Sequence, residues 1–129
     1  MSDNETVAIL VVEDDEQLLK AIGRKLMNSG FTVFEARNTT EGSALFESHG
    51  DRIRLAVLDM LLPGESGLDL AAELERRRPG MKILYISGMV ASVAMASIMR
   101  HSPESVLLKP FSLDRLVESI RKLLGKAQA

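Results

Sequence analysis

Short apolar runs alternate with longer amphipathic segments along the chain. Residues 7–12 form a continuous apolar run that is rich in β-branched side chains and stops at Glu13, as expected for a strand buried on both faces. The next segment carries leucine and isoleucine spaced for one helix face, and it ends at Ser29-Gly30, where glycine commonly follows a helix. This strand–helix alternation continues through the rest of the sequence.

Four further strand–helix pairs follow. The predicted strands span residues 32–36, 53–58, 82–86 and 105–108, and the predicted helices span residues 38–49, 66–78, 90–100 and 112–124. Asn38 (or Thr39), Ser66 and Ser112 are typical helix caps, and Pro79-Gly80 ends the third helix. Five such pairs predict an α/β fold with a parallel, doubly wound sheet that helices cover on both sides.

Composition narrows the function classes. The chain has 129 residues, 46% of them hydrophobic, and a formal net charge of −2, which predicts one domain with a real core and argues against bulk-charge binding of nucleic acid. The absence of cysteine excludes disulfides, thiolate nucleophiles and zinc–sulfur sites. The first residues are polar and acidic, unlike the basic start of a signal peptide, and the apolar run 7–12 is far shorter than the roughly 20 residues of a membrane span. We therefore expect a cytoplasmic domain over residues 1–129, with a core at about 7–124 and no output domain.

Polar residues gather where the predicted strands end. They are Glu13, Asp14 and Asp15 after the first strand, Asp59 after the third, Ser87 and Gly88 after the fourth, and Lys109 and Pro110 after the fifth. Each has an ordinary alternative role; Asp15, for example, is equally suited to cap a helix. Because the carboxyl ends of parallel strands meet at one edge of the sheet, we expect these side chains to converge.

The expected cluster suits phosphoryl transfer. Neighbouring carboxylates repel each other unless a cation joins them, and Mg²⁺ prefers oxygen ligands of this kind. A carboxylate beside Mg²⁺, an ammonium group and a hydroxyl is equipped to accept a phosphoryl group, because the cations neutralise the phosphoryl oxygens.

Five motifs in this order resemble the receiver domain of two-component response regulators, of the chemotaxis-regulator-like kind. They are Ile9-Leu-Val-Val-Glu-Asp14, Val57-Leu-Asp59-Met-Leu-Leu-Pro63-Gly64, Ser66-Gly67-Leu-Asp69-Leu, Ile86-Ser87-Gly88 and Leu108-Lys109-Pro110-Phe111. The resemblance covers residues 7–124 and implies a flavodoxin-like (βα)5 fold with strand order 2-1-3-4-5 and five helices.

The resemblance also implies a role for each site residue. Asp59 is then the phosphoacceptor, and Asp14 binds Mg²⁺ directly whereas Glu13 acts through water. Asp59 and the backbone carbonyl of Leu61 complete the protein ligands of the metal.

Other implied roles concern the phosphoryl group and the switch. Ser87 and Lys109 contact the phosphoryl oxygens, together with the backbone N–H groups of Met60 and Gly88. The Lys109–Pro110 bond is cis in the family. The family usually has an aromatic residue three positions before the lysine, and its ring reports the state of the site. This chain has Val106 at that switch position, so a switch based on a rotating ring is not expected here.

The implied reaction is transfer of a phosphoryl group to Asp59 from a phosphohistidine on a sensor histidine kinase or a histidine phosphotransfer domain. The protein is then a phosphorylation-controlled switch or relay that catalyses its own phosphorylation and dephosphorylation, and not a classical turnover enzyme. Two alternatives stay open at this point. One is a pseudo-receiver that binds partners without phosphotransfer, and the other is an aspartate-nucleophile phosphatase, which Leu61 disfavours because such enzymes carry a second aspartate there.

Two surface features have competing interpretations. The predicted fourth helix is unusually apolar, which indicates either deep packing or a homodimer through the face of helix 4, strand 5 and helix 5. The run Arg76-Arg77-Arg78 fits a solvated helix end better than a nucleic-acid patch, so direct binding of nucleic acid is not expected.

Overall fold

The computed structural model describes residues 6–62, 65–88 and 93–125. A five-stranded parallel sheet with the order β2-β1-β3-β6-β7 forms its centre. The strands are β1 (Ala8–Val12), β2 (Thr32–Ala36), β3 (Ile53–Asp59), β6 (Lys82–Ser87) and β7 (Val106–Leu108). Counted along the chain, these five strands have the order 2-1-3-4-5, which confirms the predicted fold class.

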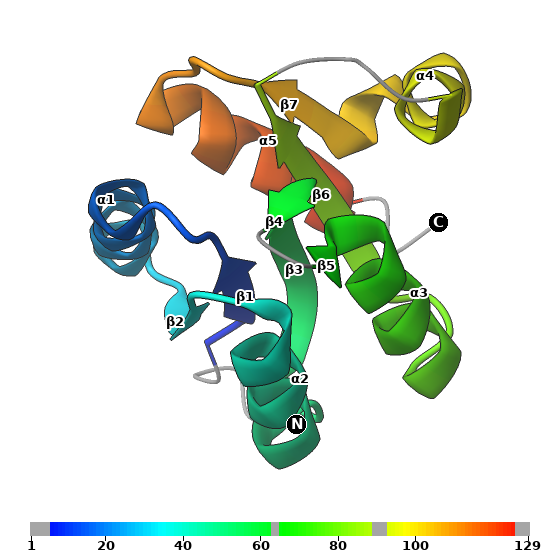
Figure 1. Cartoon of the computed structure of the whole chain (residues 1–129). Coiled ribbons are helices and arrows are strands. Elements are labelled where there is room, and N and C mark those ends of the chain that lie inside the picture. The colour runs from blue at the N-terminus through cyan, green and yellow to red at the C-terminus, as the bar shows by residue number, and fades with distance from the viewer. Residues whose placement is uncertain (1–5, 63–64, 89–92, 126–129) are drawn as a thin grey trace.

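Helices cover both faces of the sheet (Figure 1). Helices α1 (Glu16–Asn28) and α5 (Leu113–Gly125) lie on one face, and α2 (Thr39–His49), α3 (Gly67–Arg77) and α4 (Val93–His101) lie on the other. Successive strand residues serve opposite faces, because side chains alternate along a strand. In β1, for example, Ile9 packs with α1 and α5, whereas Leu10 packs with α2 and α3.

Side-chain caps fix where four helices begin. Asn38, Ser66 and Ser112 each accept a hydrogen bond from a backbone N–H in the first turn of α2, α3 and α5, at 2.8, 3.0 and 3.1 Å. Asp15 accepts one from Leu18 at 3.2 Å at the start of α1. These bonds satisfy donors that have no partner within the helix. The predicted caps are thereby confirmed, and Asp15 takes its capping role.

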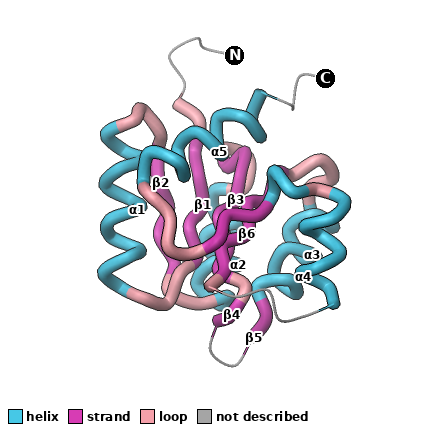
Figure 2. The backbone as a smooth tube through the Cα atoms, turned by 90° about the horizontal axis from the view of Figure 1, so that it is seen from above, coloured by secondary structure: helices cyan, strands magenta, loops and turns pink. Residues whose placement is uncertain are grey.

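Three short elements were absent from the expected pattern. Strands β4 (Leu61–Leu62) and β5 (Glu65–Ser66) form a small antiparallel ribbon beyond the carboxyl end of β3, visible below the main sheet in Figure 2. A 3-10 helix, η1 (Pro103–Ser105), precedes β7. The prediction of a strand from residue 105 is therefore wrong at its first position, because proline at residue 103 starts a helical turn there.

Helix α4 is only partly exposed on its apolar side. Met95 is buried, and Ile98 and Met99 pack against the core, whereas Val93 is 86% exposed. The start expected at residue 90 lies outside the described residues. Within the described ranges, no helix has both the length and the apolar character needed to cross a membrane.

Arg76 and Arg77 at the end of α3 are exposed, as expected for a solvated helix end, whereas Arg78 is not. Arg77 forms ion pairs with Glu47 and Glu73 at 2.7 and 3.0 Å. Arg78 is half-buried, and its guanidinium donates to the carbonyl oxygen of Ile53. The prediction of a solvated helix end is therefore wrong for Arg78, because that side chain folds back over the start of β3.

Candidate functional site

Three carboxylates meet at the carboxyl end of the sheet. Glu13 follows β1, Asp59 ends β3, and these two strands are neighbours. One oxygen each from Glu13, Asp14 and Asp59 lies within 4.8 Å of the others. Glu13 and Asp59 are buried, and Asp14 is exposed. We call these three residues the acidic cluster, and the structure assembles it where the sequence predicted a site.

A single ammonium group joins two members of the acidic cluster. Lys109 follows β7, and its Nζ lies 3.1 Å from Oε1 of Glu13 and 3.1 Å from Oδ2 of Asp59. The backbone N–H of Lys109 donates to the carbonyl oxygen of Ser87 at 2.7 Å, and the Lys109–Pro110 peptide bond is cis. The backbone thus ties the lysine to the end of β6 while its side chain reaches across to β1 and β3.

The environment changes the protonation of both partners. The pKa of Glu13 is raised to about 7, mainly by burial and also by the charge of Asp59, although a hydrogen bond from the Asp15 N–H lowers it. Burial lowers the pKa of Lys109, but its hydrogen bond to Asp59 and its attraction to the carboxylates of Glu13 and Asp59 outweigh burial and hold the pKa above the ordinary value. The lysine therefore remains charged at neutral pH.

The donor set fits a divalent cation. Fully ionised, the acidic cluster and Lys109 carry three negative charges and one positive charge, which leaves an excess of two negative charges. Oε1 of Glu13 is buried and has no hydrogen-bond partner among the described residues, although it pairs electrostatically with Lys109. Oxygen ligands alone, one of them exposed at Asp14, suit Mg²⁺. Leu61 begins β4 two residues after Asp59, and the role of its carbonyl as a ligand stays a prediction.

The groups expected to bind the phosphoryl group differ in burial and in hydrogen bonding. Ser87 is buried at the end of β6, and Gly88 next to it is exposed. The N–H of Met60, however, donates to the carbonyl oxygen of Ile86 at 3.0 Å. Met60 therefore continues the parallel pairing of β3 with β6, and the contact of its N–H with a phosphoryl oxygen stays a prediction.

Gly67 supports the site in a way that the sequence analysis missed. As the first residue of α3 it packs directly onto the backbone of Asp59, so that a Cβ atom at this position would overlap the Asp59 carbonyl oxygen and lie 3.3 Å from Cα of Met60. The only sequence signal was a glycine directly after the capping residue Ser66. Glycine allows α3 to begin against the strand that carries the phosphoacceptor candidate.

The structure also shows what lies beside Val106. This residue pairs in register with Tyr85 of β6, and both contribute to the same apolar cluster as α4. Tyr85 is buried, and burial raises the pKa of its phenol to about 12, so the ring stays neutral. The aromatic ring absent at position 106 is thus present on the neighbouring strand.

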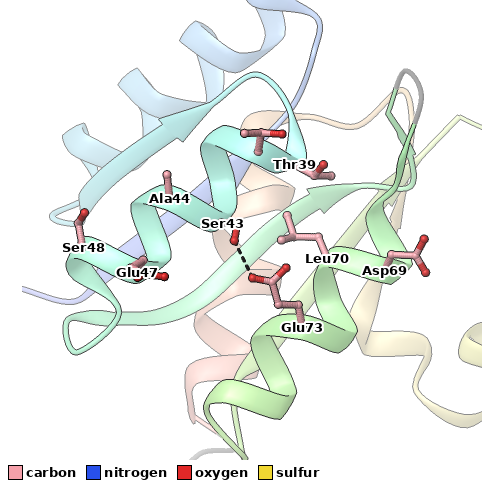
Figure 3. Close-up of a pocket in the computed structure, with 9 residues that line it drawn as sticks. Thr39, Ser43, Ala44, Glu47, Ser48, Asp69, Leu70 and Glu73 are labelled. Carbon is pink, nitrogen blue, oxygen red and sulfur yellow. Dashed lines mark hydrogen bonds between the residues drawn. The ribbon is translucent and has the colours of Figure 1, made fainter.

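A pocket of about 630 Å³ opens elsewhere, between α2 and α3 (Figure 3). Hydroxyl and carboxylate side chains line it, and Oγ of Ser43 donates to Oε2 of Glu73 at 2.6 Å. It contains no member of the acidic cluster and not Lys109. The charged site and this hollow are therefore separate features.

Comparison with known proteins identifies the family to which this arrangement of residues corresponds. A family model described as "Response regulator receiver domain" matches residues 9–121. The chain is 28% identical over 121 residues to "Sensor kinase CckA" of Brucella abortus (strain 2308), covering 94% of this chain and 13% of the kinase. It is 28% identical over 125 residues to "Probable transcriptional regulatory protein TcrX" of Mycobacterium tuberculosis (strain ATCC 25618 / H37Rv), covering 97% of this chain and 53% of that protein. The chain thus spans only part of these relatives.

Solved structures show the same fold. The crystal structure of a response regulator receiver protein from Sinorhizobium medicae WSM419 superimposes with a TM-score of 0.82 at 29% identity, covering 95% of this chain and 98% of the other. This similarity therefore extends over nearly the whole described chain.

Proposed function

The chain belongs to the response regulator receiver domain family, and from this premise we propose that it accepts a phosphoryl group on Asp59 in a Mg²⁺-dependent reaction. The observation that carries the proposal is the position of Lys109 Nζ, 3.1 Å from both a buried glutamate and the buried Asp59. An ammonium group held beside the acceptor oxygen can pair with a phosphoryl oxygen as negative charge arrives.

The proposed reaction forms one bond and breaks one bond. An oxygen of Asp59 attacks the phosphorus of a phosphohistidine in line, and the phosphorus–nitrogen bond to the imidazole breaks as the acyl phosphate forms. Lys109 then pairs with a phosphoryl oxygen, and the hydroxyl of Ser87 donates a hydrogen bond to another. The groups that would hold Mg²⁺ are Asp14, Asp59, the carbonyl of Leu61 and, through water, Glu13, and the bound ion would further neutralise the phosphoryl oxygens.

Hydrolysis of the acyl phosphate returns Asp59 to its carboxylate form. The domain therefore handles only its own phosphoryl group, as a switch or relay, and does not turn over a free substrate. Among the relatives, one is named a sensor kinase and another a probable transcriptional regulatory protein. We accordingly expect the phosphodonor to be a sensor histidine kinase or a histidine phosphotransfer domain in the cytoplasm, with no direct binding of nucleic acid by this chain.

We further propose that phosphorylation of Asp59 favours a homodimer formed through α4, β7 and α5. Leu108 of β7 is 43% exposed and Val93 of α4 is 86% exposed, so both can contribute apolar area to a second copy. Sedimentation of the protein with and without beryllofluoride tests this proposal. A monomer in both states, at all concentrations, would contradict it.

Intact mass spectrometry tests the phosphoacceptor proposal directly. We expect incubation with Mg²⁺ and acetyl phosphate to add the mass of one phosphoryl group, and we expect EDTA or the Asp59→Asn substitution to prevent this gain. The matched control is Asp51→Asn, which changes an exposed aspartate in the turn before β3 and should leave the gain intact. Failure of both phosphorylation and Mg²⁺-dependent beryllofluoride binding would contradict the proposal and favour the pseudo-receiver.

A further inference from the structure

A second charged hollow lies at the opposite end of the sheet, where the parallel strands begin. It has a volume of about 230 Å³. Its rim carries Arg54, Arg78 and Lys82, and its apolar wall includes Val7, Pro79 and Leu124. We call this feature the basic pocket. Arg54 and Asp59 stand five residues apart on β3, so the basic pocket is roughly 17 Å along the strand from the phosphoacceptor candidate.

Within the part of the chain that the structure describes, no acidic side chain balances the charge of the basic pocket. Among the residues that line it and that the structure describes, none is a carboxylate. Within the described part of the chain, no ion pair includes Arg54, Arg78 or Lys82. Other cations, such as Lys25 and Arg77, do have acidic partners. Three uncompensated cations around one concavity repel one another, and an anion between them would relieve that repulsion.

The guanidinium of Arg78 is held in place before any ligand arrives. Arg78 donates from Nη1 to the carbonyl oxygen of Ile53, and its guanidinium carbon lies 5.6 Å from the centre of the Phe46 ring. An arginine has five N–H donors, so four remain after this bond. Fixing the side chain in advance lowers the entropy that a ligand would lose by ordering it.

The neighbouring backbone brings the other two cations to the same rim. The turn after α3 is closed by a hydrogen bond from the N–H of Met81 to the carbonyl of Arg78 at 3.2 Å, and Gly80 supplies its positive φ of 90°. The register of β3 with β6 pairs Leu55 with Lys82, which brings Arg54 beside the start of β6. Arg54 is also the one exposed residue in a strand that is otherwise buried.

From these observations we propose that the basic pocket binds an oxyanion of the phosphate class. Planar guanidinium groups donate paired hydrogen bonds to phosphate oxygens, and the lysine adds a point charge. Such an oxyanion is available as free phosphate or as the headgroup of an anionic lipid. The pocket shares no residue with the acidic cluster, so this binding is independent of phosphoryl transfer to Asp59.

Amide NMR of the ¹⁵N-labelled chain tests the proposal. The Asp59→Asn protein is titrated in EDTA with inorganic phosphate, with chloride adjusted to keep the ionic strength constant. We expect saturable shifts of the Gly80 and Lys82 amides, with no matching change at Gly88 beside the acidic cluster. Because the background lacks Asp59, failure here is distinguishable from failure of the phosphoacceptor proposal.

Charge-removing variants decide whether the pocket itself is responsible. Arg54→Gln and Lys82→Gln should each weaken phosphate binding about tenfold, as expected for one charge-assisted contact. Arg24→Gln, which changes an exposed arginine of α1, should not weaken it. Unchanged spectra away from the pocket will show that each variant is folded.

Vesicles distinguish the two sources of the oxyanion. Flotation with phosphatidylglycerol vesicles that fails with phosphatidylcholine, and that Arg54→Gln abolishes, would assign the ligand to lipid; saturation by phosphate alone would assign it to a free anion. The proposal is overturned if phosphate causes no saturable shift by about 10 mM, where a site with a Kd of ~1 mM would be filled, and vesicles do not bind. Equal responses in the variants and the parent protein would overturn it as well.

Discussion

The two ends of the central sheet carry opposite charges and compensate them differently. At the carboxyl end, the chain itself supplies Lys109, which lies 3.1 Å from each of two carboxylates in the acidic cluster. At the amino end, the basic pocket contains three cations and, among its described lining residues, no carboxylate. One site is thus partly neutralised by its own chain, whereas the described residues supply no such counter-charge to the other.

The charged side chains at the two ends of the sheet also differ in how deeply they are buried. Glu13 and Asp59 are buried, whereas Arg54 is exposed and Arg78 and Lys82 are half-buried. Charges interact more strongly when water is excluded. A substitution at the carboxyl end should therefore have larger consequences than one at the amino end, and the following experiments test that order.

The largest effect is expected from removing the shared ammonium group. Lys109→Met leaves Asp59 without the cation that would pair with the incoming phosphoryl group. Loss of one such preorganised donor typically slows a reaction by about 10²–10³-fold, and we expect this decrease in the rate of phosphorylation by acetyl phosphate. Lys20→Met, which removes an exposed lysine paired with Glu35, is the control. A rate within tenfold of the parent protein would show that Lys109 is not needed.

The next largest effect is a pH dependence of stability, which follows from the raised pKa of Glu13. This pKa is about 7 in the folded protein against an ordinary value of 4.5, so the folded state keeps a proton that the unfolded state releases. The resulting stabilisation is complete below pH 4.5 and is lost as the pH rises through 7. In EDTA, the free energy of unfolding should therefore fall by about 3 kcal/mol across this range.

Urea denaturation at about pH 5 and about pH 8 measures this loss. Glu13→Gln cannot titrate, so its free energy of unfolding should change less over the same interval. Saturating Mg²⁺ should reduce the loss in the parent protein, because a cation favours the ionised carboxylate. Parallel pH profiles of the parent and the variant would contradict the assignment to Glu13.

A methyl group at Gly67 should disturb the carboxyl end through the backbone. The added Cβ of Gly67→Ala overlaps the carbonyl oxygen of Asp59, so either α3 or the end of β3 must move. We expect a loss of about 2 kcal/mol in the free energy of unfolding, as for other overpacked positions. Gly125→Ala is the matched control, since nothing lies within 4 Å of its added Cβ. Equal stability of the two variants would show that the contact relaxes freely.

The smallest effect is expected at the amino end. Arg78→Gln removes the hydrogen bond to Ile53 and the contact with the Phe46 ring, which should cost about 1 kcal/mol in urea denaturation. Arg76→Gln alters an exposed neighbour and should change stability by less than about 0.5 kcal/mol. If Arg78→Gln destabilises the protein more than Gly67→Ala does, the ranking of the two ends is wrong.

The sequence predicted the sheet because short, largely apolar runs alternate with capped helices. It could not predict β4 and β5, since two-residue strands are too short to show any periodicity. It also placed Ser105 in a strand, where Pro103 begins a 3-10 turn. These errors lie in short connections, where local backbone preferences compete with the pattern of burial.

The charged groups of the site were predictable in identity but not in pairing. The ends of parallel strands predicted that Glu13, Asp59 and Lys109 would converge, and the structure brings them together. The commitment of the Met60 N–H to Ile86 depends on how far the β3–β6 pairing extends, which no single strand encodes. The turn of Arg78 back onto Ile53 likewise depends on tertiary contacts.

The order of the strands along the chain also determines when each charged group of the site is synthesised on the ribosome. Strands β1, β2 and β3 are adjacent and lie in the first half of the chain, so they can pair as soon as Asp59 has emerged. Lys109 follows 50 residues later, which takes about 3–10 s at typical rates of translation. For those seconds the nascent chain holds its carboxylates without the ammonium group that later joins them. Once these strands bury the carboxylates, a solvent cation or a proton on Glu13 can offset their repulsion until Lys109 has been synthesised.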